Sequence, residues 1–325
     1  MLISIVIPAH NRPALLLEAI QSIAQQDYSH YEVVIIDDGS TPPISRVELE
    51  VALGRPVIFQ RHDSPLGVPR AKNAGIKAAH GEVILLLDDD DLLTPDALAC
   101  ISRAYARHPE IDCLFLGVEP FGPYADGPSK NREAALTKII KSAVPHEIDE
   151  LYVFAGDLFD ALLKTVPIDF QRPAARRAMW NIAGGFDESC LFSESAWAIR
   201  ASCIGTIALT KAPVTRWRIH DNNFGWPPNL EPRQIRRRQI DNGVRAGGQL
   251  LAQFEVEERL WRARRKMIKK HQAEQLSSKA YFLRGISWRE GMRALIQSFL
   301  LAPRPAQLKL AVAYLLPRVW FKTGA

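Results

Sequence analysis

Four consecutive carboxylates, Asp88 to Asp91, follow directly after the apolar run Val83-Ile84-Leu85-Leu86-Leu87. Carboxylates this close repel one another and raise one another's pKa, so a fold that keeps them together places a cation among them. A hard divalent ion with oxygen ligands is the usual partner of such a group. The run therefore predicts a metal site at the end of a buried strand, with a solvated acidic loop as the plain alternative.

Strands that alternate with helices would position these carboxylates. Hydrophobic periodicity predicts strands over 2–8, 32–36, 57–60, 83–87 and 112–118, and helices over 13–26, 69–80 and 95–108. Asn11 and Thr94 are the expected N-caps of the first and last of these helices. This alternation predicts right-handed crossovers and a mostly parallel, Rossmann-like α/β sheet flanked by helices. The second acidic group, Asp37-Asp38-Gly39-Ser40, ends the second strand, so both groups are predicted at one edge of the sheet.

The pattern is weaker after residue 118. We expect an irregular segment over 121–167 with a helix near 134–141, followed by a loop, a short helix and a strand over 176–207. Prolines at 227, 228 and 232 mark the predicted boundary between residues 1–226 and a helical, basic and amphipathic region at 227–325.

Composition indicates a soluble globular protein, since 47% of the 325 residues are apolar and 24% are charged. The four cysteines form no Cys-x-x-Cys pair, which argues against zinc and a disulfide framework and favours a reducing compartment. We find no basic, apolar leader and no run of 18 apolar residues. A cytoplasmic protein is therefore expected.

Five segments in order resemble one known family. They are Val6-Ile7-Pro8-Ala9-His10-Asn11-Arg12, Val34-Ile35-Ile36-Asp37-Asp38-Gly39-Ser40, Lys72-Asn73-Ala74-Gly75, Gly81-Glu82 through Asp91, and Gly184-Gly185-Phe186-Asp187-Glu188. Over residues 2–222 the sequence resembles the inverting GT-A glycosyltransferases of family 2. The resemblance implies a nucleotide-sugar donor, a nucleotide-sugar-binding half at 1–118 and an acceptor half at 119–226.

The resemblance implies that Pro8, Ala9 and Asn11 lie near the base and ribose of the donor. Asp38, with Asp37 as the second choice, would accept a hydrogen bond from the base. A carboxylate suits the ring N–H of uracil or thymine, so a UDP- or dTDP-sugar is preferred. The plain alternative is that this segment is only a turn, because Asp and Gly favour turns.

By the same resemblance, Asp88 or Asp89 would contact the ribose and Asp90 would hold Mn²⁺ or Mg²⁺. The segment that ends in His220 resembles a family segment whose histidine approaches the metal or the diphosphate. Such an ion would neutralise the charge that develops on a diphosphate leaving group. A satisfied structural histidine is the alternative for His220.

Lys72 stands where family members often carry arginine, which keeps the charge but loses the bidentate fork. Arg70, two residues earlier, could take the same role, and both are candidate donor-binding residues. Alternatively, both are surface residues of an amphipathic helix.

The family's catalytic base precedes an arginine, here Arg200, and this register assigns the base to Glu194. A shift of one residue would assign it to Ser195, which could not deprotonate an acceptor hydroxyl. A helix N-terminal charge is the alternative role for Glu194. On the acceptor side, Asp187 and Trp197 are candidates, with a turn cap and core packing as their respective alternatives.

The tail from about residue 233 to 270 is rich in Arg and Lys, and apolar and aromatic residues follow it. A solvated helical face is the default interpretation. Contact with an anionic membrane surface is the more specific interpretation, because basic, apolar and aromatic residues together suit a helix that lies in the membrane–water interface. Such contact would place the protein at the inner face of the membrane, near lipid-linked acceptors. No nucleic-acid-binding motif is evident, so no nucleic-acid partner is expected.

These features together predict a metal-dependent inverting glycosyltransferase that acts on a glycan or lipid-linked acceptor in cell-surface glycan assembly. The alternative is a non-catalytic nucleotide-binding or membrane-associated scaffold protein. A phosphotransferase of the haloacid-dehalogenase type is disfavoured, because its Asp-x-Asp motif ends the first strand and here the acidic run follows the fourth.

Overall fold

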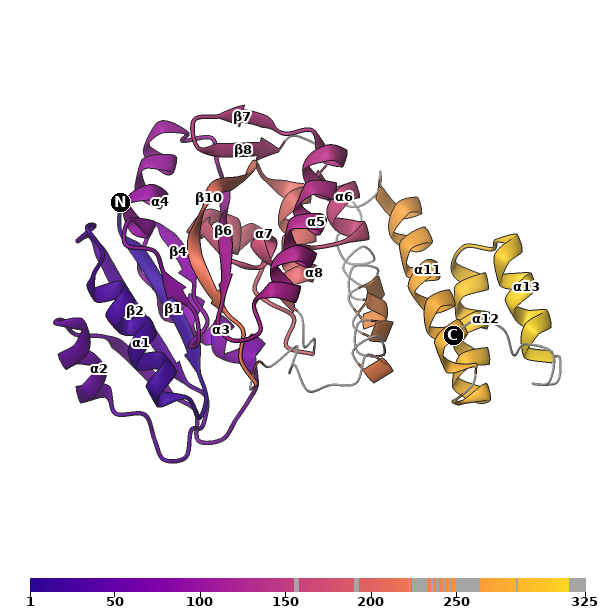
Figure 1. The fold of residues 1–325 in the computed structure, drawn as a ribbon, viewed down its shortest axis with the longest axis horizontal. Helices are drawn as coiled ribbons and strands as arrows, with labels where there is room; N and C mark the ends of the chain where they lie inside the picture. The colour runs from indigo at the N-terminus through magenta and orange to yellow at the C-terminus, as the bar shows by residue number, and fades with distance from the viewer. Residues whose placement is uncertain are drawn as a thin grey trace. The chain divides into compact units, whose positions relative to one another are not determined.

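The computed structural model describes residues 1–154, 158–189, 193–221, 223, several residues between 233 and 248, 264–284 and 286–315. The chain divides into two compact units, residues 1–228 and 229–325. The first unit carries the α/β sheet and the second is built from helices (Figure 1).

The described part of the first unit contains a ten-stranded mixed sheet. Its order is β3-β2-β1-β4-β9-β6-β10-β8-β7, and β5 pairs with β10. The strands are β1 (Ile3–Ala9), β2 (Tyr31–Asp37), β3 (Ile58–Arg61), β4 (Val83–Leu86), β5 (Leu92–Leu93), β6 (Cys113–Phe121), β7 (His146–Ile148), β8 (Leu151–Phe154), β9 (Pro173–Arg176) and β10 (Ile207–Arg218).

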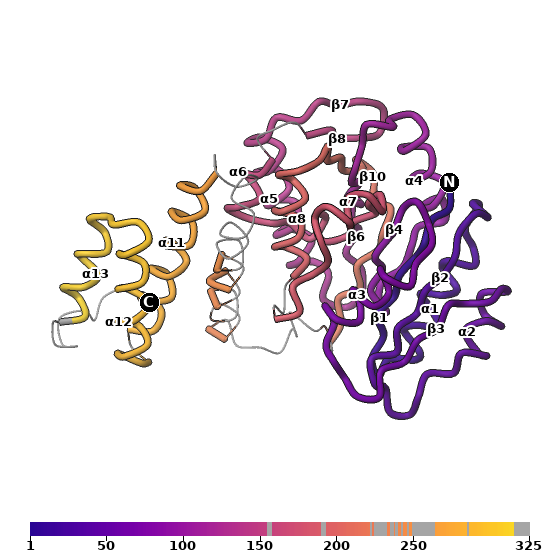
Figure 2. The backbone as a smooth tube through the Cα atoms, turned by 180° about the vertical axis from the view of Figure 1, so that it is seen from behind, coloured from indigo at the N-terminus to yellow at the C-terminus, as the bar shows by residue number. Residues whose placement is uncertain are grey.

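Helices flank this sheet, as Figure 1 and the reverse view in Figure 2 show. They are α1 (Pro13–Ala24), α2 (Arg46–Leu53), α3 (Val68–Ala78), α4 (Ala97–Arg107), α5 (Asp126–Ala143), α6 (Leu158–Lys164), the 3₁₀ helix η1 (Ile168–Gln171), α7 (Arg177–Ala183) and α8 (Ser193–Ile204). The predicted α/β class with flanking helices is confirmed.

Side chains of β1 point alternately to the two faces of the sheet, and a helix packs on each face. Ile5 and Ile7 share a core cluster with Leu16 and Ile20 of α1. Val6, which points the other way because side chains alternate along a strand, contacts α3. The strand therefore reads as a continuous apolar run, as expected for a strand that is buried on both faces.

Three local predictions need correction. Arg12, not Asn11, is the N-cap residue of α1, because Asn11 adopts a left-handed φ of 54° and its side chain accepts a hydrogen bond from Thr41 N instead. The helix predicted from Pro95 begins at Ala97, with Asp96 as its N-cap. The sheet is also less parallel than predicted, because β9 inserts antiparallel between β4 and β6.

The strands β1, β2 and β4 are mutually parallel, with Ala9 opposite Asp37 and Val6 opposite Leu86. Their carboxyl ends therefore lie at one edge of the sheet, and both acidic groups follow there, as predicted. Two further strands bring residues to the same edge. The antiparallel β9 starts there, and β10 ends there because it runs parallel to β6.

The second unit contains α11 (Arg265–Leu283), α12 (Trp288–Leu301) and α13 (Pro305–Leu315). A small core joins them, in which Leu276 and Ala280 of α11 pack with Leu295 of α12 and Tyr314 of α13. The Tyr314 hydroxyl donates a hydrogen bond to the Ala280 carbonyl. Among the described residues no helix is both long and apolar enough to cross a membrane.

The close approach of α3 to β1 predicts a large effect of one added methyl group. A Cβ at Gly75 would lie 2.2 Å from Cγ1 of the buried, β-branched Val6, so Gly75→Ala should lower the free energy of unfolding by about 1–3 kcal/mol. A Cβ at Gly127 of α5 meets nothing within 4 Å, so Gly127→Ala should change it by no more than about 0.5 kcal/mol. Urea denaturation of both variants checks this, and equal midpoints would contradict the packing described.

Candidate functional site

The segments that follow β1 and β2 form one hydrogen-bonded corner. Asn11 N donates to Ser40 Oγ at 2.9 Å, and Thr41 N donates to Asn11 Oδ1 at 2.7 Å. Pro8 and Ala9, the last residues of β1, are buried beneath it, whereas Asn11 is exposed. The structure thus brings Asn11 beside the Asp37-Asp38 segment, as the predicted donor-binding group requires.

Asp37 and Asp38 differ in what surrounds their carboxylates. The Asp37 side chain has no exposed surface; it accepts from the Ser40 and Ile44 amides and pairs with Arg61. These bonds hold its pKa below the usual range despite burial, which acts to raise it. The Asp37 carboxylate is therefore engaged within the turn.

Asp38 is held from the segment that leads into α3. Its Oδ1 accepts from Leu66 N at 2.9 Å and lies 2.7 Å from His62 Nδ1, and its Oδ2 accepts from Gly67 N at 2.8 Å. A carboxylate oxygen can accept two hydrogen bonds, so Oδ2 retains acceptor capacity. Of the two aspartates, Asp38 is thus the one whose carboxylate keeps acceptor capacity.

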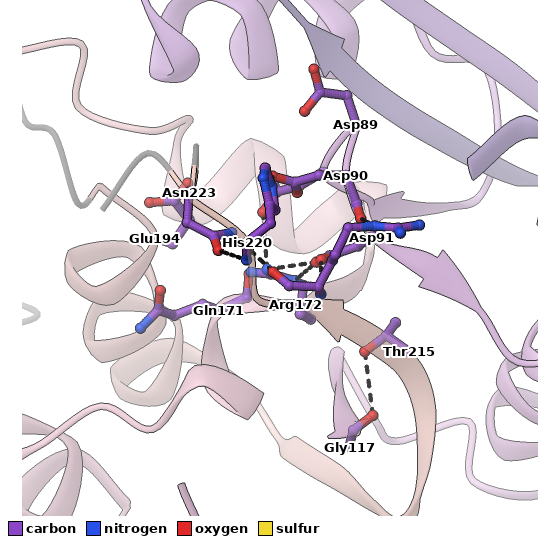
Figure 3. A network of polar contacts seen from close by, with 12 residues as sticks. Asp89, Asp90, Asp91, Gly117, Gln171, Arg172, Glu194, Thr215, His220 and Asn223 are labelled. Atoms are coloured by element: carbon purple, nitrogen blue, oxygen red, sulfur yellow. Dashed lines mark hydrogen bonds and ion pairs between the residues drawn. The ribbon is translucent and has the colours of Figure 1, made fainter. Parts of the chain in front are cut away.

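The four carboxylates after β4 do not all point the same way. Single oxygens of Asp88, Asp90 and Asp91 lie within 4.8 Å of one another. The Asp89 side chain points away from Asp90 and Asp91 (Figure 3) and accepts from His10 N at 3.2 Å. The acidic run is therefore not a solvated loop, because Asp89, Asp90 and Asp91 are all buried.

Arg172 neutralises the inner side of this group. It donates to Asp91 Oδ2 through Nε at 3.0 Å and through NH2 at 2.7 Å, and NH2 lies 3.0 Å from Asp88 Oδ2. The residue directly precedes the antiparallel strand β9, which explains its place at the end of β4. Sequence reasoning missed Arg172, since it lies in the stretch of weak pattern and no local signal distinguishes it.

Lys72 connects the acidic group to the predicted base. Its Nζ lies 2.8 Å from Asp88 Oδ1 and 2.7 Å from Glu194 Oε1, and its side chain is 3% exposed. Burial acts to lower the pKa of Lys72, but the charges of Asp88 and Glu194 raise it well above the usual range. Of the two candidate cations, the structure therefore brings Lys72 to the acidic group, whereas Arg70 is half-exposed and pairs with Glu188.

Asp90 is shared by two partners that come from different ends of the unit. Arg12 NH1 lies 2.7 Å from Asp90 Oδ2 and 3.1 Å from Asp89 Oδ1. His220, two residues beyond β10, places Nε2 3.2 Å from the same Asp90 oxygen (Figure 3). The two predicted metal-binding residues, Asp90 and His220, are therefore adjacent. The sequence did not predict the contact of Arg12 with Asp90, although Arg12 ends the first of the five family-like segments.

The electrostatics of the group fit a divalent cation. Burial raises the pKa of Asp91 to about 7 against the opposing charge of Arg172, and burial together with the Asp90 charge raises that of Asp89 to about 7. Burial also acts to raise the pKa of Asp88, but Lys72 and Arg172 hold it well below the usual range. Carboxylates whose mutual repulsion is incompletely compensated are suitable ligands for Mn²⁺ or Mg²⁺.

The loop after α7 is clamped from two helices. Asn73 of α3 exchanges hydrogen bonds with the Phe186 backbone at 2.8 Å each. Trp197 Nε1 of α8 donates to the Gly184 carbonyl at 2.9 Å. Within the loop, Asp187 Oδ1 accepts from Ser189 N at 2.8 Å, which is the turn-cap geometry that the sequence left as an alternative.

For Trp197, an acceptor-side candidate, the structure shows the alternative of core packing. The indole is 1% exposed and stacks on Trp180 with ring centroids 4.1 Å apart, and it also packs against Phe115 and Phe186. Neither ring face can therefore meet a ligand, and Trp197 instead holds the Gly184 loop and anchors α8. Since Glu194 lies on the first turn of α8, that packing also determines where the candidate base stands.

The mixed sheet, with acidic segments at the carboxyl ends of β2 and β4, has the GT-A fold. Solved structures share this fold. TarS 1–349 of S. aureus is 17% identical with a TM-score of 0.58, and the match covers 93% of this chain and 81% of that one. A mannosyltransferase of Pyrobaculum calidifontis, solved with GDP-Man and Mn²⁺, is 18% identical with a TM-score of 0.55, over 96% and 78% of the two chains.

Sequence comparison gives the family. Residues 4–123 match the model of glycosyl transferase family 2. An uncharacterized glycosyltransferase of Haemophilus influenzae is 31% identical over 114 residues, which are 35% of this chain and 38% of the relative. The O-antigen biosynthesis protein RfbC of Myxococcus xanthus is 35% identical over 117 residues, which are 35% and 9% of the two proteins. Residues 4–123 are thus similar to glycosyl transferase family 2, as the motifs predicted, and the matches span 13–38% of the length of the first three curated relatives.

Two of the cations on α3, Lys72 and Arg70, provide a direct test of the site's electrostatics. Lys72→Met removes a buried charge and leaves Asp88 and Glu194 short of a partner, so the free energy of unfolding should fall by about 3 kcal/mol. Arg70→Met removes an exposed charge from the same helix and should cost no more than about 0.5 kcal/mol. Urea denaturation without divalent ions measures both, and equal losses would contradict the bridging role of Lys72.

Proposed function

We propose that this protein is a metal-dependent inverting glycosyltransferase that moves a sugar from a nucleotide diphosphate to an acceptor hydroxyl. The observation that carries the proposal is the bridge from Asp88 through Lys72 to Glu194. The bridge joins the acidic group, which is expected to bind the donor, to Glu194, which is expected to act as the base. A scaffold that only binds nucleotides has no use for such a link.

Donor binding is assigned to the sheet edge. TarS has been solved with UDP-GlcNAc and the P. calidifontis enzyme with GDP-Man, which supports a nucleotide-sugar donor here. Asp38 would accept the base N–H, which favours a UDP- or dTDP-sugar, while Asn11 would lie against the ribose. A bound Mn²⁺ or Mg²⁺, held by Asp90 with His220 beside it, would neutralise the leaving diphosphate.

Glu194 would perform the proton transfer. Its carboxylate would take the proton of the acceptor hydroxyl while that oxygen forms a bond to the anomeric carbon. The bond from the anomeric carbon to the diphosphate oxygen breaks with its electron pair on the diphosphate, and the configuration inverts. Lys72 orients the carboxylate by its 2.7 Å contact, since a misplaced base is costly.

The acceptor is proposed to be a glycan or a lipid-linked sugar in cell-surface glycan assembly. The name of the M. xanthus relative, an O-antigen biosynthesis protein, supports that setting.

Loss of the base should separate chemistry from binding. Glu194→Gln keeps the shape of the side chain but cannot accept the proton, so donor turnover should fall by about 10²- to 10⁴-fold while the Kd for the donor stays nearly unchanged. Candidate donors are first identified by a thermal-shift screen of nucleotide sugars with and without Mn²⁺. Glu147→Gln on the exposed strand β7 is the matched control. Full turnover by Glu194→Gln would favour the non-catalytic scaffold.

A membrane contact is proposed for the second unit. Residues 264–315 carry eleven Lys and Arg against two Glu. On α12 and α13 a group of large apolar side chains is exposed, namely Ile296, Phe299, Leu300, Leu308 and Val312. Apolar side chains surrounded by basic ones suit an anionic membrane surface, where the protein would meet a lipid-linked acceptor.

Two substitutions on α12 test this contact. Phe299→Asp with Leu300→Asp places charge on the exposed apolar face and should abolish most co-sedimentation with vesicles that contain anionic lipid. The matched control is Val47→Asp with Val51→Asp, which changes two exposed apolar residues on α2 of the first unit. Unchanged sedimentation of the α12 variant would exclude this face as the contact.

A further inference from the structure

Among the described residues, three lysine or arginine side chains form ion pairs with the carboxylates of the acidic group, and these side chains differ in exposure. The Lys72 and Arg172 side chains are 3% and 6% exposed, and each bridges two carboxylates from within the protein. The Arg12 side chain is 21% exposed and approaches from the outer side, at the start of α1. Among the three, Arg12 is therefore the cation that can leave without opening the core.

Arg12 also occupies an oxygen of Asp90, the residue proposed to hold the metal. Its NH1 group donates to Asp90 Oδ2 at 2.7 Å and to Asp89 Oδ1 at 3.1 Å. A divalent ion bound to Asp90 at the usual distance of roughly 2.1 Å would lie within a few ångströms of that guanidinium. Two cations so close repel each other strongly, so the ion and Arg12 compete for Asp90.

We propose that Arg12 is an exchangeable counter-cation that holds the acidic group together without metal and is displaced from Asp90 when a divalent ion binds. This inference rests on the metal site of the proposed function. Displacement of Arg172 instead would strip the buried Asp91 of its counter-charge, which is far more costly. The released guanidinium is a planar set of donors at the sheet edge and suits the diphosphate of the donor.

The test measures Mn²⁺ binding alone, by isothermal titration calorimetry at pH 8 without nucleotide. Arg12→Gln removes the competing charge, so Mn²⁺ should bind tighter by on the order of tenfold. Arg46→Gln removes an exposed arginine of α2 that pairs with Glu50. This variant should bind Mn²⁺ as the wild type does. Asp90→Asn should lose the binding in either background.

The outcomes separate the exchange from the metal site itself. Wild-type binding of Mn²⁺ with equal or weaker binding by Arg12→Gln would overturn the exchange and leave the metal site standing. Failure of the wild type to bind Mn²⁺ would overturn both. A crystal structure of the wild type with Mn²⁺ tests the same point without a variant: the Arg12 guanidinium should have left Asp90, and its retention on Asp90 beside a bound ion would refute the exchange.

Discussion

Repulsion among the carboxylates that follow β4 is the constraint on which the rest of the first unit depends. Four of them stand in sequence and three are buried, so their charge must be balanced within the fold. The buried side chains of Lys72 and Arg172 supply that balance, and a nitrogen of each lies within 3.0 Å of an Asp88 oxygen. The acidic corner is therefore a compensated electrostatic network, and its outer side, where Arg12 lies, is the part able to respond to a ligand.

That network accounts for the topology of the sheet beyond β4. An antiparallel β9 between β4 and β6 is needed to start a strand at the carboxyl edge, and Arg172 stands at that start. The long β10 ends at the same edge and delivers Arg218, whose backbone N–H donates to Asp91 Oδ1 at 3.0 Å, and then His220. Segments that are 80 to 130 residues apart thus meet on one short acidic loop.

Aromatic packing gives the network its second support. Trp197 lies in a cluster with Trp180, Phe186 and Phe115, and its indole N–H holds the Gly184 carbonyl. A rigid α8 keeps Glu194 at a defined distance from Lys72. The position of this candidate base thus depends on residues of the core.

The sequence alone determined the elements of the first half and the position of the acidic run at the end of a buried strand. Strand and helix periodicity is local, so β1, β2, β4 and α3 could be recognised within a residue or two, and parallel connection then placed both acidic groups at one edge. Motif order likewise identified the family. Only the tertiary structure decided that Lys72 rather than Arg70 enters the site and that Arg12 and Arg172 balance its negative charge. It likewise decided that Asn11 binds Thr41 instead of capping α1, and that Trp197 is buried. Each of these depends on contacts between residues distant in the chain, and no local pattern encodes which distant charge or aromatic ring a side chain will meet.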